Sequence, residues 1–312
     1  MSFWKSTVYE MAVTGRPPSI AVVTGAKSGI GLALRRKIAS FPFIEQIVAV
    51  SRTITAADVT NDDPKCVAVA ADIATADGRA AVVDKVKELC AGGGGGGGGT
   101  TKQVRFLIHS AGTIDPIKPI LDLELHELEN AIKVNVEGPL FLTTALHAYL
   151  QPITADGVAG RVLHVSSGAA HGAPPVGWGT YGITKAAFFQ SFRVLERELR
   201  GTGVVVGSFK PGVVDTNMQG NIRNASPDAM PMVQNFIHLK AKVQDSVPTQ
   251  ARPPPPGALD SPDNVAFFAE FLLLGTTDEE FANAHDDNEW DIRNKANFAR
   301  WILPERLPPK EE

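Results

Sequence analysis

The sequence predicts a single doubly wound α/β domain, in which a parallel sheet carries helices on both of its faces. Short, almost wholly apolar segments alternate along the chain with longer segments that carry apolar residues at helical spacing. Such alternation is typical of parallel strands joined by right-handed helical crossovers. The apolar character of the short segments indicates strands that are buried on both sides of the sheet. A length of 312 residues would also fit two small domains, so this pattern decides the prediction.

Each element follows from its own residue pattern. Strands are expected at Ser19–Thr24, Gln46–Ser51, Cys66–Ala70, Val104–His109, Arg161–Ser166 and Gly203–Phe209. Helices are expected where apolar residues recur on one stripe, at Ile30–Phe41, Ala80–Cys90, Leu123–Leu150 and Thr180–Arg200. We expect the longest helix to bend near Gly138-Pro139, because proline removes a helix hydrogen bond.

Two segments interrupt the alternation, within a domain expected over residues 19–312. Gly92–Gly99 is a run of eight glycines, and because glycine has the largest ordering entropy we expect a flexible loop insertion over residues 91–103. Phosphate binding by this run is disfavoured, since a strand and not a helix follows it. The second interruption spans residues 213–258.

The tripeptide Ser-Pro-Asp occurs in this part of the chain at 226–228 and at 261–263. A serine N-cap, a proline at the first helical position and an acid in the first turn are typical of a helix start. The first should therefore open a short helix with Met232, Val233, Phe236 and Ile237 on one side. Between the two, Pro253–Pro256 favours an extended surface linker, with a proline-rich docking ligand as the alternative.

Composition disfavours several classes of protein. A net charge of −4 gives no basic excess for nucleic acid and no polybasic patch for a membrane. The two cysteines, Cys66 and Cys90, cannot form a disulfide framework and are expected to be free buried thiols. The histidines lack paired spacing with acids or cysteines, so no metal is assigned. No apolar run approaches the roughly 18 residues of a membrane span. Residues 1–18 lack a secretory pattern and are interpreted as an extension, which makes the cytoplasm the default compartment.

The turn after the first strand has the features of a dinucleotide site. Its sequence is Thr24-Gly25-Ala26-Lys27-Ser28-Gly29-Ile30-Gly31. Glycines at these spacings allow a tight turn, close approach of the backbone to a pyrophosphate, and close packing of helix on strand. The helix that begins at Gly29 would direct its N–H groups toward that phosphate.

This turn resembles the TGxxxGIG motif of the short-chain dehydrogenase/reductase family, and the resemblance covers about Ser19 to Gly275. The family has a Rossmann-type fold and a nicotinamide cofactor, which would contact Gly25, Gly29, Ile30 and Gly31 here. The spacing G-x-x-x-G-x-G differs from the common G-x-G-x-x-G fingerprint.

The end of the second predicted strand favours NADP over NAD. An NAD site would place an acid there to accept a hydrogen bond from the ribose 2′-hydroxyl. The sequence has Ser51-Arg52 instead, and Arg52 can form a charge-assisted fork with a 2′-phosphate while Ser51 adds a hydroxyl. Lys27 could add a second cation; the alternative for Arg52 is a solvated surface arginine. Asp72-Ile73 matches the family's adenine-contacting pair.

Tyr181-Gly182-Ile183-Thr184-Lys185 matches the family's YxxxK signature at the start of a predicted helix. The spacing puts both side chains on one helix face, about one turn apart. Tyrosine is a poor acid–base catalyst at neutral pH, and we expect the neighbouring ammonium to lower its pKa. The resemblance implies that Tyr181 is the catalytic proton donor and that Lys185 also holds the nicotinamide ribose.

Two further residues match the family's catalytic set. Ser167 is expected to hold and polarise the substrate carbonyl, in preference to its neighbour Ser166, although the interval from Ser167 to Tyr181 is one residue longer than usual. Asn135 occupies the family's helix-kink position, where it would hold a water that links Lys185 to solvent. The alternative for Asn135 is a packing role within the helix.

The segment after the fourth strand departs from the family. Its usual NNAG is replaced by His109-Ser110-Ala111-Gly112. Ala111 and Gly112 can still form the floor beneath the cofactor, whereas His109 is expected to be a hydrogen-bonded structural histidine. After the sixth strand, Val214 and Thr216 fall in a match to the family's PGxxxT and would meet the nicotinamide carboxamide. The resemblance further implies that residues 213–258 form a substrate lid.

Together these motifs predict NADPH-dependent reduction of a ketone, aldehyde or dicarbonyl. Trp178 is expected to line the substrate pocket, and the surrounding loops are most similar to the sepiapterin reductase and fungal benzil reductase branch. The alternatives are an NADP-dependent alcohol dehydrogenase working oxidatively and a non-catalytic NADP-binding regulator. The expected partner is a small carbonyl compound, with neither nucleic acid nor membrane; homodimeric and homotetrameric states stay open.

Overall fold

A parallel sheet of seven strands lies at the centre of the molecule, in the order β3-β2-β1-β4-β5-β6-β7. The structure is a computed structural model that describes residues 16–60, 63–91, 102–153, 157–242, 248–282 and 289–307. The strands are β1 (Ser19–Thr24), β2 (Ile44–Ser51), β3 (Cys66–Ala70), β4 (Gln103–His109), β5 (Gly160–Val165), β6 (Val204–Lys210) and β7 (Trp290–Asp291). The order reverses between β1 and β4, which creates a switch point at the carboxyl ends of these strands.

The predicted fold class is confirmed, and the six predicted strands are present with ends that differ by no more than two residues. The seventh strand, β7, was not predicted. It has only two residues, so no apolar run or alternation marks it in the sequence. It extends the sheet beyond β6, where Phe209 pairs with Trp290.

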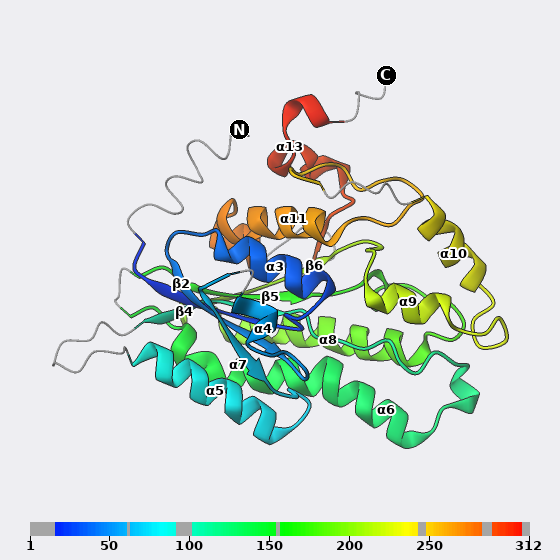
Figure 1. Cartoon of the computed structure of the whole chain (residues 1–312), viewed down its shortest axis with the longest axis horizontal. Coiled ribbons are helices and arrows are strands. Elements are labelled where there is room, and N and C mark those ends of the chain that lie inside the picture. The colour runs from blue at the N-terminus through cyan, green and yellow to red at the C-terminus, as the bar shows by residue number, and fades with distance from the viewer. Residues whose placement is uncertain are drawn as a thin grey trace.

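Helices cover both faces of the sheet (Figure 1). The helices α3 (Gly29–Ala39) and α11 (Pro262–Leu274) lie on one face; α5 (Ala76–Cys90), α7 (Gly138–Leu150) and α8 (Gly179–Glu198) lie on the other. Strand β1 shows why two cores result, because Ala21 and Val23 pack into one core while Ile20 and Val22 pack into the other. The shorter helices are α4 (Ala57–Thr60), α6 (Leu125–Ile132), α9 (Asn217–Arg223), α10 (Val233–Ala241), α12 (Asp278–Ala282) and α13 (Phe298–Trp301).

The long helix predicted over residues 123–150 is divided by a π-helical turn. Helix α6 ends at Ile132, the π turn spans Lys133–Glu137, and α7 begins at Gly138. Pro139 lies in the first turn of α7. The predicted long helix is thus interrupted just before Gly138-Pro139, and the interruption is a π turn.

The two Ser-Pro-Asp segments behave differently. Ser261 caps α11 as predicted, and its Oγ accepts a hydrogen bond of 3.2 Å from the Asp263 N–H. The prediction for Ser226 was wrong, because the chain there forms a turn in which the Met230 N–H donates to the Ser226 carbonyl at 2.9 Å. The next helix, α10, begins only at Val233.

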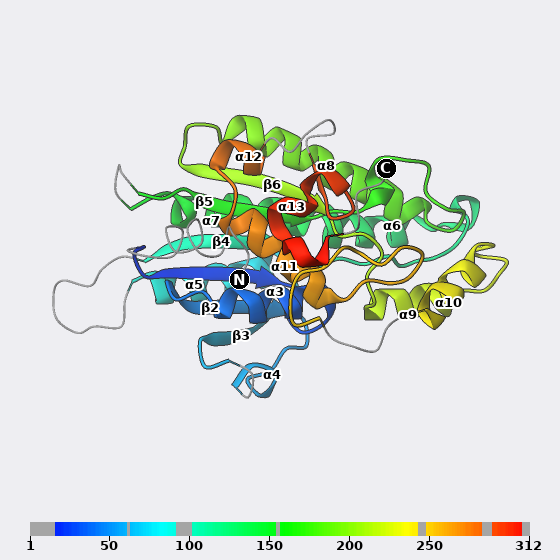
Figure 2. The same ribbon diagram turned by 90° about the horizontal axis from the view of Figure 1, so that it is seen from above.

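Helix α10 buries less of its apolar surface than the sequence suggested. Val233 and Phe236 are buried, whereas Met232 is 45% exposed and Ile237 is 38% exposed. Figure 2 shows α10 beside α9 at one end of the molecule, away from the strands.

Several other predictions concern the remainder of the chain. The two cysteines are free and buried, as predicted. Among the described helices, none has the length and apolar character needed to cross a bilayer. Residues 253–255 have no regular secondary structure. The eight-glycine run and most of the predicted N-terminal extension lie outside the described residues.

Candidate active site

A crevice opens at the carboxyl ends of the strands, on both sides of the point where the strand order reverses. It consists of two adjoining cavities of about 610 Å³ and about 550 Å³. The larger cavity extends over the ends of β5 and β6, and the smaller one over the ends of β2 and β3. Both are lined by Gly25, Ser28, Arg52, Ala111, Gly112, Thr113 and Asp115. Such a crevice is where open parallel sheets bind their ligands.

The glycine turn after β1 packs too tightly to admit side chains. Gly25 and Gly29 have φ angles of 68° and 55°, which strongly favour glycine. A Cβ at Gly31 would lie 2.2 Å from the carbonyl oxygen of Gly25. As a result the first turn of α3 lies directly against β1, and Gly29, Ile30 and Gly31 line the larger cavity.

The end of β2 carries a cation into the crevice. Arg52 lines both cavities and Ser51 lines the smaller one, together with Asp72 and Ile73 from the end of β3. Lys27 also reaches this region but lies outside both linings. Its Nζ donates to the Thr53 carbonyl at 2.7 Å and pairs with Asp58 on α4 at 3.2 Å.

The segment after β4 forms the floor of the crevice without the family's asparagines. Thr24 Oγ1 accepts hydrogen bonds from the Ser110 N–H at 3.1 Å and from the Ala111 N–H at 3.2 Å. His109 is buried, and its Nε2 is 2.8 Å from Thr143 Oγ1. Burial lowers the pKa of His109 to about 3. The histidine is therefore a structural group, as the sequence analysis expected.

Tyr181 and Ser167 meet in the larger cavity. Tyr181 lies in the first turn of α8, and the Ser167 hydroxyl is near enough to its phenol group to lower the pKa of Tyr181. The Ser167 Oγ also accepts from the Ala169 N–H at 3.2 Å, which fixes its position. Ser166 Oγ, in contrast, is buried and has no hydrogen-bond partner. Of the two adjacent serines, Ser167 is the one that contacts the tyrosine.

Lys185 lies one turn beyond Tyr181 on α8 and is also buried. Its Nζ donates to the Val165 carbonyl at 3.0 Å and lies 5.8 Å from the centre of the Tyr181 ring. Burial lowers the pKa of Lys185 to about 8, and the nearby carboxylate of Glu289 partly opposes that change. Burial likewise raises the pKa of Tyr181, with the Ser167 hydrogen bond acting in the opposite direction. The expectation that Lys185 lowers the pKa of Tyr181 is not met in the protein alone, because burial dominates.

Asn135 is buried at the middle of the π turn and lines neither cavity. Its Oδ1 accepts from the Thr113 N–H at 2.8 Å, and its Nδ2 donates to the Thr113 carbonyl at 2.8 Å and to Thr184 Oγ1 at 2.9 Å. These bonds join the π turn to the floor of the crevice and to α8. A Cβ at Gly112 would lie 3.3 Å from Asn135 Oδ1 and 3.9 Å from Lys185 Nζ, so the two groups flank the same glycine.

An apolar wall closes the other side of the larger cavity. Trp178, just before α8, packs edge-on against Tyr181 with ring centres 5.8 Å apart and lies 5.4 Å from Phe236 of α10. Val214 and Thr216 line the same cavity, as does Met218 of α9. An ion pair of 2.5 Å between Lys240 and Asp215 ties the end of α10 to the segment after β6.

The crevice thus brings together all of the predicted site residues except Lys27 and Asn135. It also includes residues that the sequence did not single out, among them Ile222 and Arg293. Ile222 lies within the segment expected to be a lid, so its general location was foreseeable. Arg293 follows the unpredicted β7, and no motif marks it. In the described part of the chain, no three metal-ligating side chains gather.

Comparisons with known proteins agree with this geometry. The sequence model of the short chain dehydrogenase family matches residues 19–227. A benzil reductase ((S)-benzoin forming) from Bacillus cereus is 35% identical over 136 residues, which are 43% of this chain and 53% of that protein. The match therefore spans about half the length of that relative. Sepiapterin reductase from Rattus norvegicus is 30% identical over 221 residues, which cover 67% of this chain and 79% of that enzyme.

Solved structures share the fold. A short chain dehydrogenase/reductase from Saccharomyces cerevisiae superposes with a TM-score of 0.70 at 21% identity, covering 93% of this chain and 100% of that one. The RhlG/NADP active-site complex from Pseudomonas aeruginosa gives a TM-score of 0.67 at 22% identity and covers 88% of this chain and 95% of that chain. Because the family's sequence model matches about two thirds of the residues, the chain belongs to the short chain dehydrogenase family of oxidoreductases.

Proposed function

We propose that the protein reduces a ketone, an aldehyde or a dicarbonyl compound to the alcohol, with NADPH as the reductant. The observation that carries this proposal is that Tyr181, Ser167 and Lys185 line the same cavity, with Lys185 one helical turn beyond Tyr181. A proton donor beside a second hydroxyl is the arrangement that a carbonyl oxygen needs when it gains negative charge.

The residues present fit a dinucleotide. The turn of Gly25 and Gly31 leaves no room for side chains between α3 and β1, so backbone N–H groups can approach a pyrophosphate there. The two cavities together give an elongated site on both sides of that turn. When bound, the cofactor supplies a hydride to the substrate carbon. Val214 and Thr216 would hold its carboxamide end, and Asp72 and Ile73 would contact the opposite end.

Preference for NADPH rests on Arg52. It lines the crevice where an NAD-specific site would carry an acid after the second strand, and a guanidinium there suits a 2′-phosphate. Ser51 adds a hydroxyl at the same place. Lys27 is a weaker candidate than the sequence suggested, because its ammonium already pairs with Asp58. The NADP complex of the Pseudomonas aeruginosa relative is consistent with this assignment.

The protein's own groups would act in three ways. Tyr181 donates a proton to the carbonyl oxygen, and its raised pKa keeps that proton in place at neutral pH. Ser167 donates a hydrogen bond to the same oxygen and stabilises the charge that develops on it. Lys185 holds the cofactor ribose and passes on the proton that Tyr181 must regain. Asn135 acts indirectly, because its hydrogen bonds to Thr113 and Thr184 hold the floor of the crevice against α8.

The same observations weigh against the rival functions. An alcohol dehydrogenase would use the same residues in the opposite direction, and a preference for NADP separates the two, because cells keep this cofactor mostly reduced. A non-catalytic regulator would be expected to have lost one of the four family residues, and all four are present. The apolar wall around Trp178 favours aryl or bulky dicarbonyl substrates over small polar ketones. The benzil reductase among the relatives is in keeping with that class.

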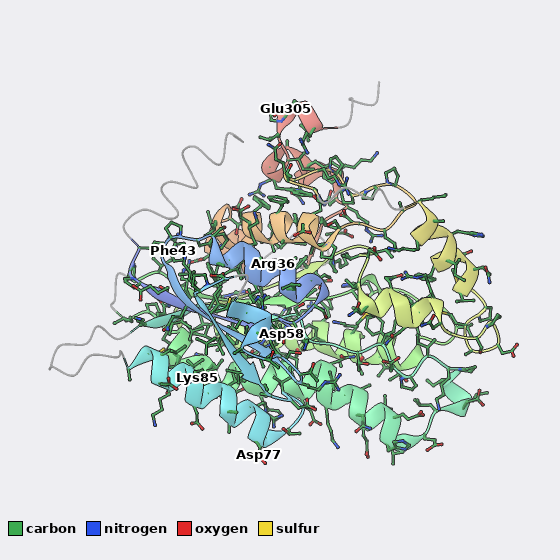
Figure 3. All side chains as sticks on the ribbon, viewed as in Figure 1. Arg36, Phe43, Asp58, Asp77, Lys85 and Glu305 are labelled. Carbon is green, nitrogen blue, oxygen red and sulfur yellow. The ribbon has the colours of Figure 1, made fainter. Side chains whose placement is uncertain are left out.

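The test is a panel of aryl ketones, aryl aldehydes and vicinal diketones, with consumption of NADPH and of NADH followed by absorbance. We expect turnover with NADPH and little with NADH. Arg52→Asp should raise the KM for NADPH strongly and narrow the difference between the cofactors, because it removes the partner of the 2′-phosphate. Arg36→Asp is the matched control, since Arg36 lies on α3 (Figure 3) and outside both cavities. Equal use of NADH by the wild-type enzyme would refute the role of Arg52.

A further inference from the structure

A buried glutamate lies on the same side of the sheet as Lys185. Glu289 immediately precedes β7, and its side chain is fully buried. Its Oε1 accepts a hydrogen bond of 2.6 Å from Ser208 Oγ, and its Oε2 hydrogen-bonds His171 Nε2. Both oxygens are thus held by side chains from two other segments, β6 and the loop after β5. A carboxylate so firmly fixed in the interior has a defined position relative to the site.

The strand register shows how Glu289 relates to Lys185. Ser208 is the register partner of His164 on β5, and register partners point to the same face of a sheet. His164 stacks on Phe188 of α8 with ring centres 4.2 Å apart. Lys185 Nζ lies 5.1 Å from the same Phe188 ring. His164, Glu289 and Lys185 therefore share the space between the sheet and α8.

The charges in that space are few. Burial lowers the pKa of His164 well below its usual value and that of His109 to about 3, so both are neutral near pH 7. Burial raises the pKa of Tyr181, which is neutral as well. Toward the mouth of the crevice the charged side chains are engaged with other groups: Asp115, Lys210, Asp291 and Arg293. Among the described residues, Glu289 is the carboxylate whose field raises the pKa of Lys185.

We propose that Glu289 is a positioning residue for Lys185: its carboxylate, fixed by Ser208 and His171, keeps the lysine ammonium charged over the working pH range. The role of Lys185 in turnover rests on the proposed function, but the electrostatic coupling of the two residues does not. Without the carboxylate, a lysine buried to this degree loses its proton more readily. Lys185 would then fail to hold the cofactor and to return a proton to Tyr181.

The experiment compares wild type with Glu289→Gln, which keeps the shape of the side chain and removes its charge. Two quantities are measured. One is the pKa of Lys185, followed by NMR of ¹³C-labelled lysine side chains and assigned with Lys185→Arg. The other is the alkaline limb of kcat/KM for a carbonyl substrate. Both should move to lower pH, because the carboxylate raises the pKa of Lys185, while kcat/KM at the acidic end of the profile stays near the wild-type value.

Two further variants make the result specific. Asp291→Asn removes a carboxylate from β7 itself, where it pairs with Arg293, and should leave both quantities unchanged. His171→Gln removes an ionisable neighbour of Glu289, and with it any contribution of imidazole titration to the profile. The His171→Gln protein is then compared with the double variant His171→Gln/Glu289→Gln. If the alkaline limb still moves to lower pH between these two proteins, the shift comes from Lys185.

An unchanged pKa of Lys185 in a folded Glu289→Gln protein would overturn the proposal. So would an equal loss of activity at every pH, because that is the signature of a merely structural residue. If Glu289→Gln does not fold, Glu289→Asp is tested instead, because it draws the charge back by one methylene. The pKa of Lys185 should then fall by a smaller amount, and an unchanged pKa would refute the proposal equally clearly. Should no carbonyl compound be reduced at all, the proposed function fails, while the NMR titration still decides the coupling.

Discussion

At the scale of single residues, the adjacent serines illustrate how backbone geometry assigns chemical roles. Ser166 continues the extended backbone of β5, since its N–H donates to the Phe209 carbonyl at 2.9 Å. Successive side chains of an extended chain point to opposite sides. The Ser166 hydroxyl is consequently buried without a partner, while the Ser167 hydroxyl reaches Tyr181. The lengthened interval between Ser167 and Tyr181 is accommodated in the loop and does not separate the two hydroxyls.

This difference leads to a prediction about three conservative variants. Tyr181→Phe should lower kcat by about 10²–10⁴-fold, the range expected when a general acid is lost, while NADPH binding persists. Ser167→Ala should be severe, because it removes a donor to the developing oxyanion. Ser166→Ala should be mild, because the Ser166 hydroxyl is buried and has no hydrogen-bond partner. Steady-state kinetics on one well-used carbonyl, with NADPH binding followed by fluorescence, would check all three.

The order of severity is the informative result. A damaging Ser166→Ala with a harmless Ser167→Ala would reverse the assignment of the serines. Near wild-type turnover by Tyr181→Phe would remove the catalytic interpretation and favour a cofactor-binding regulator.

At the scale of elements, the sequence predicts the strands and helices that have a regular apolar pattern. It misses the elements that have no such pattern. The strands were found because both of their faces are buried, which gives apolar runs with clear ends. The π turn was missed because it spans only five residues and no sequence motif marks it. In the structure, Asn135 of this turn bonds Thr113 and Thr184, which are distant in sequence.

The two Ser-Pro-Asp segments show the limit of a local motif. Both have the residues of a helix start, yet only Ser261 caps a helix. After Ser226 the chain reaches Pro231, which has no N–H to donate to the carbonyl four residues earlier and so stops a helix within its first turn. The same limit applies to the site. Residues that belong to family motifs were predicted, whereas Glu289 and Arg293, which lie beside the two-residue strand β7, were not.

The wall formed by Trp178 and Phe236 of α10 leads to a prediction about substrate selectivity. Trp178→Ala should change the relative kcat/KM among substrates, with the largest loss for diaryl compounds, because it removes an apolar surface of the substrate pocket. Cofactor binding should be spared, since Trp178 lies at the Tyr181 end of the crevice and is not part of the smaller cavity. The measurement is kcat/KM across the carbonyl panel together with the KM for NADPH.

Phe188→Leu is a useful contrast to Trp178→Ala, because Phe188 packs against His164 beneath the site and lines neither cavity. It should lower stability without changing the order of substrates. An equal loss for every substrate in Trp178→Ala would place the tryptophan in the structural core and not in a substrate-selecting wall.

At the scale of the whole molecule, the centre of the sheet holds two histidines where most positions are aliphatic. His109 and His164 are register partners on β4 and β5, and their rings lie 5.3 Å apart. Both are buried, and His109 finds a partner in Thr143 of α7. Neutral imidazoles are tolerated there, but a proton on either would place a charge in the middle of the domain.

This burial makes the whole fold sensitive to mild acid. Burial sets the pKa of His109 at about 3 in the folded protein, below the value of about 6.5 in an unfolded chain. As the pH falls below 6.5, the unfolded chain therefore takes up a proton that the folded protein does not, and the free energy of unfolding falls. The slope is about 1.4 kcal/mol per pH unit for each such histidine, and stability is fully present only above pH 6.5 or so. His109→Asn, which can keep a hydrogen bond to Thr143, should reduce the slope by about that amount.

The measurement is urea unfolding of wild type and His109→Asn at several values between pH 5 and pH 7, a window chosen because most carboxylates titrate below it. His126→Gln, which removes an imidazole from the exposed side of α6, controls for the loss of a histidine as such. Wild type and His109→Asn should differ in the slope of the free energy of unfolding against pH, and not only in its value at neutral pH. The reason is that the proton is taken up by His109 only in the unfolded state. Parallel lines for wild type and His109→Asn would mean that His109 binds its proton equally in both states, and the acid sensitivity of the fold would then have to come from another buried group.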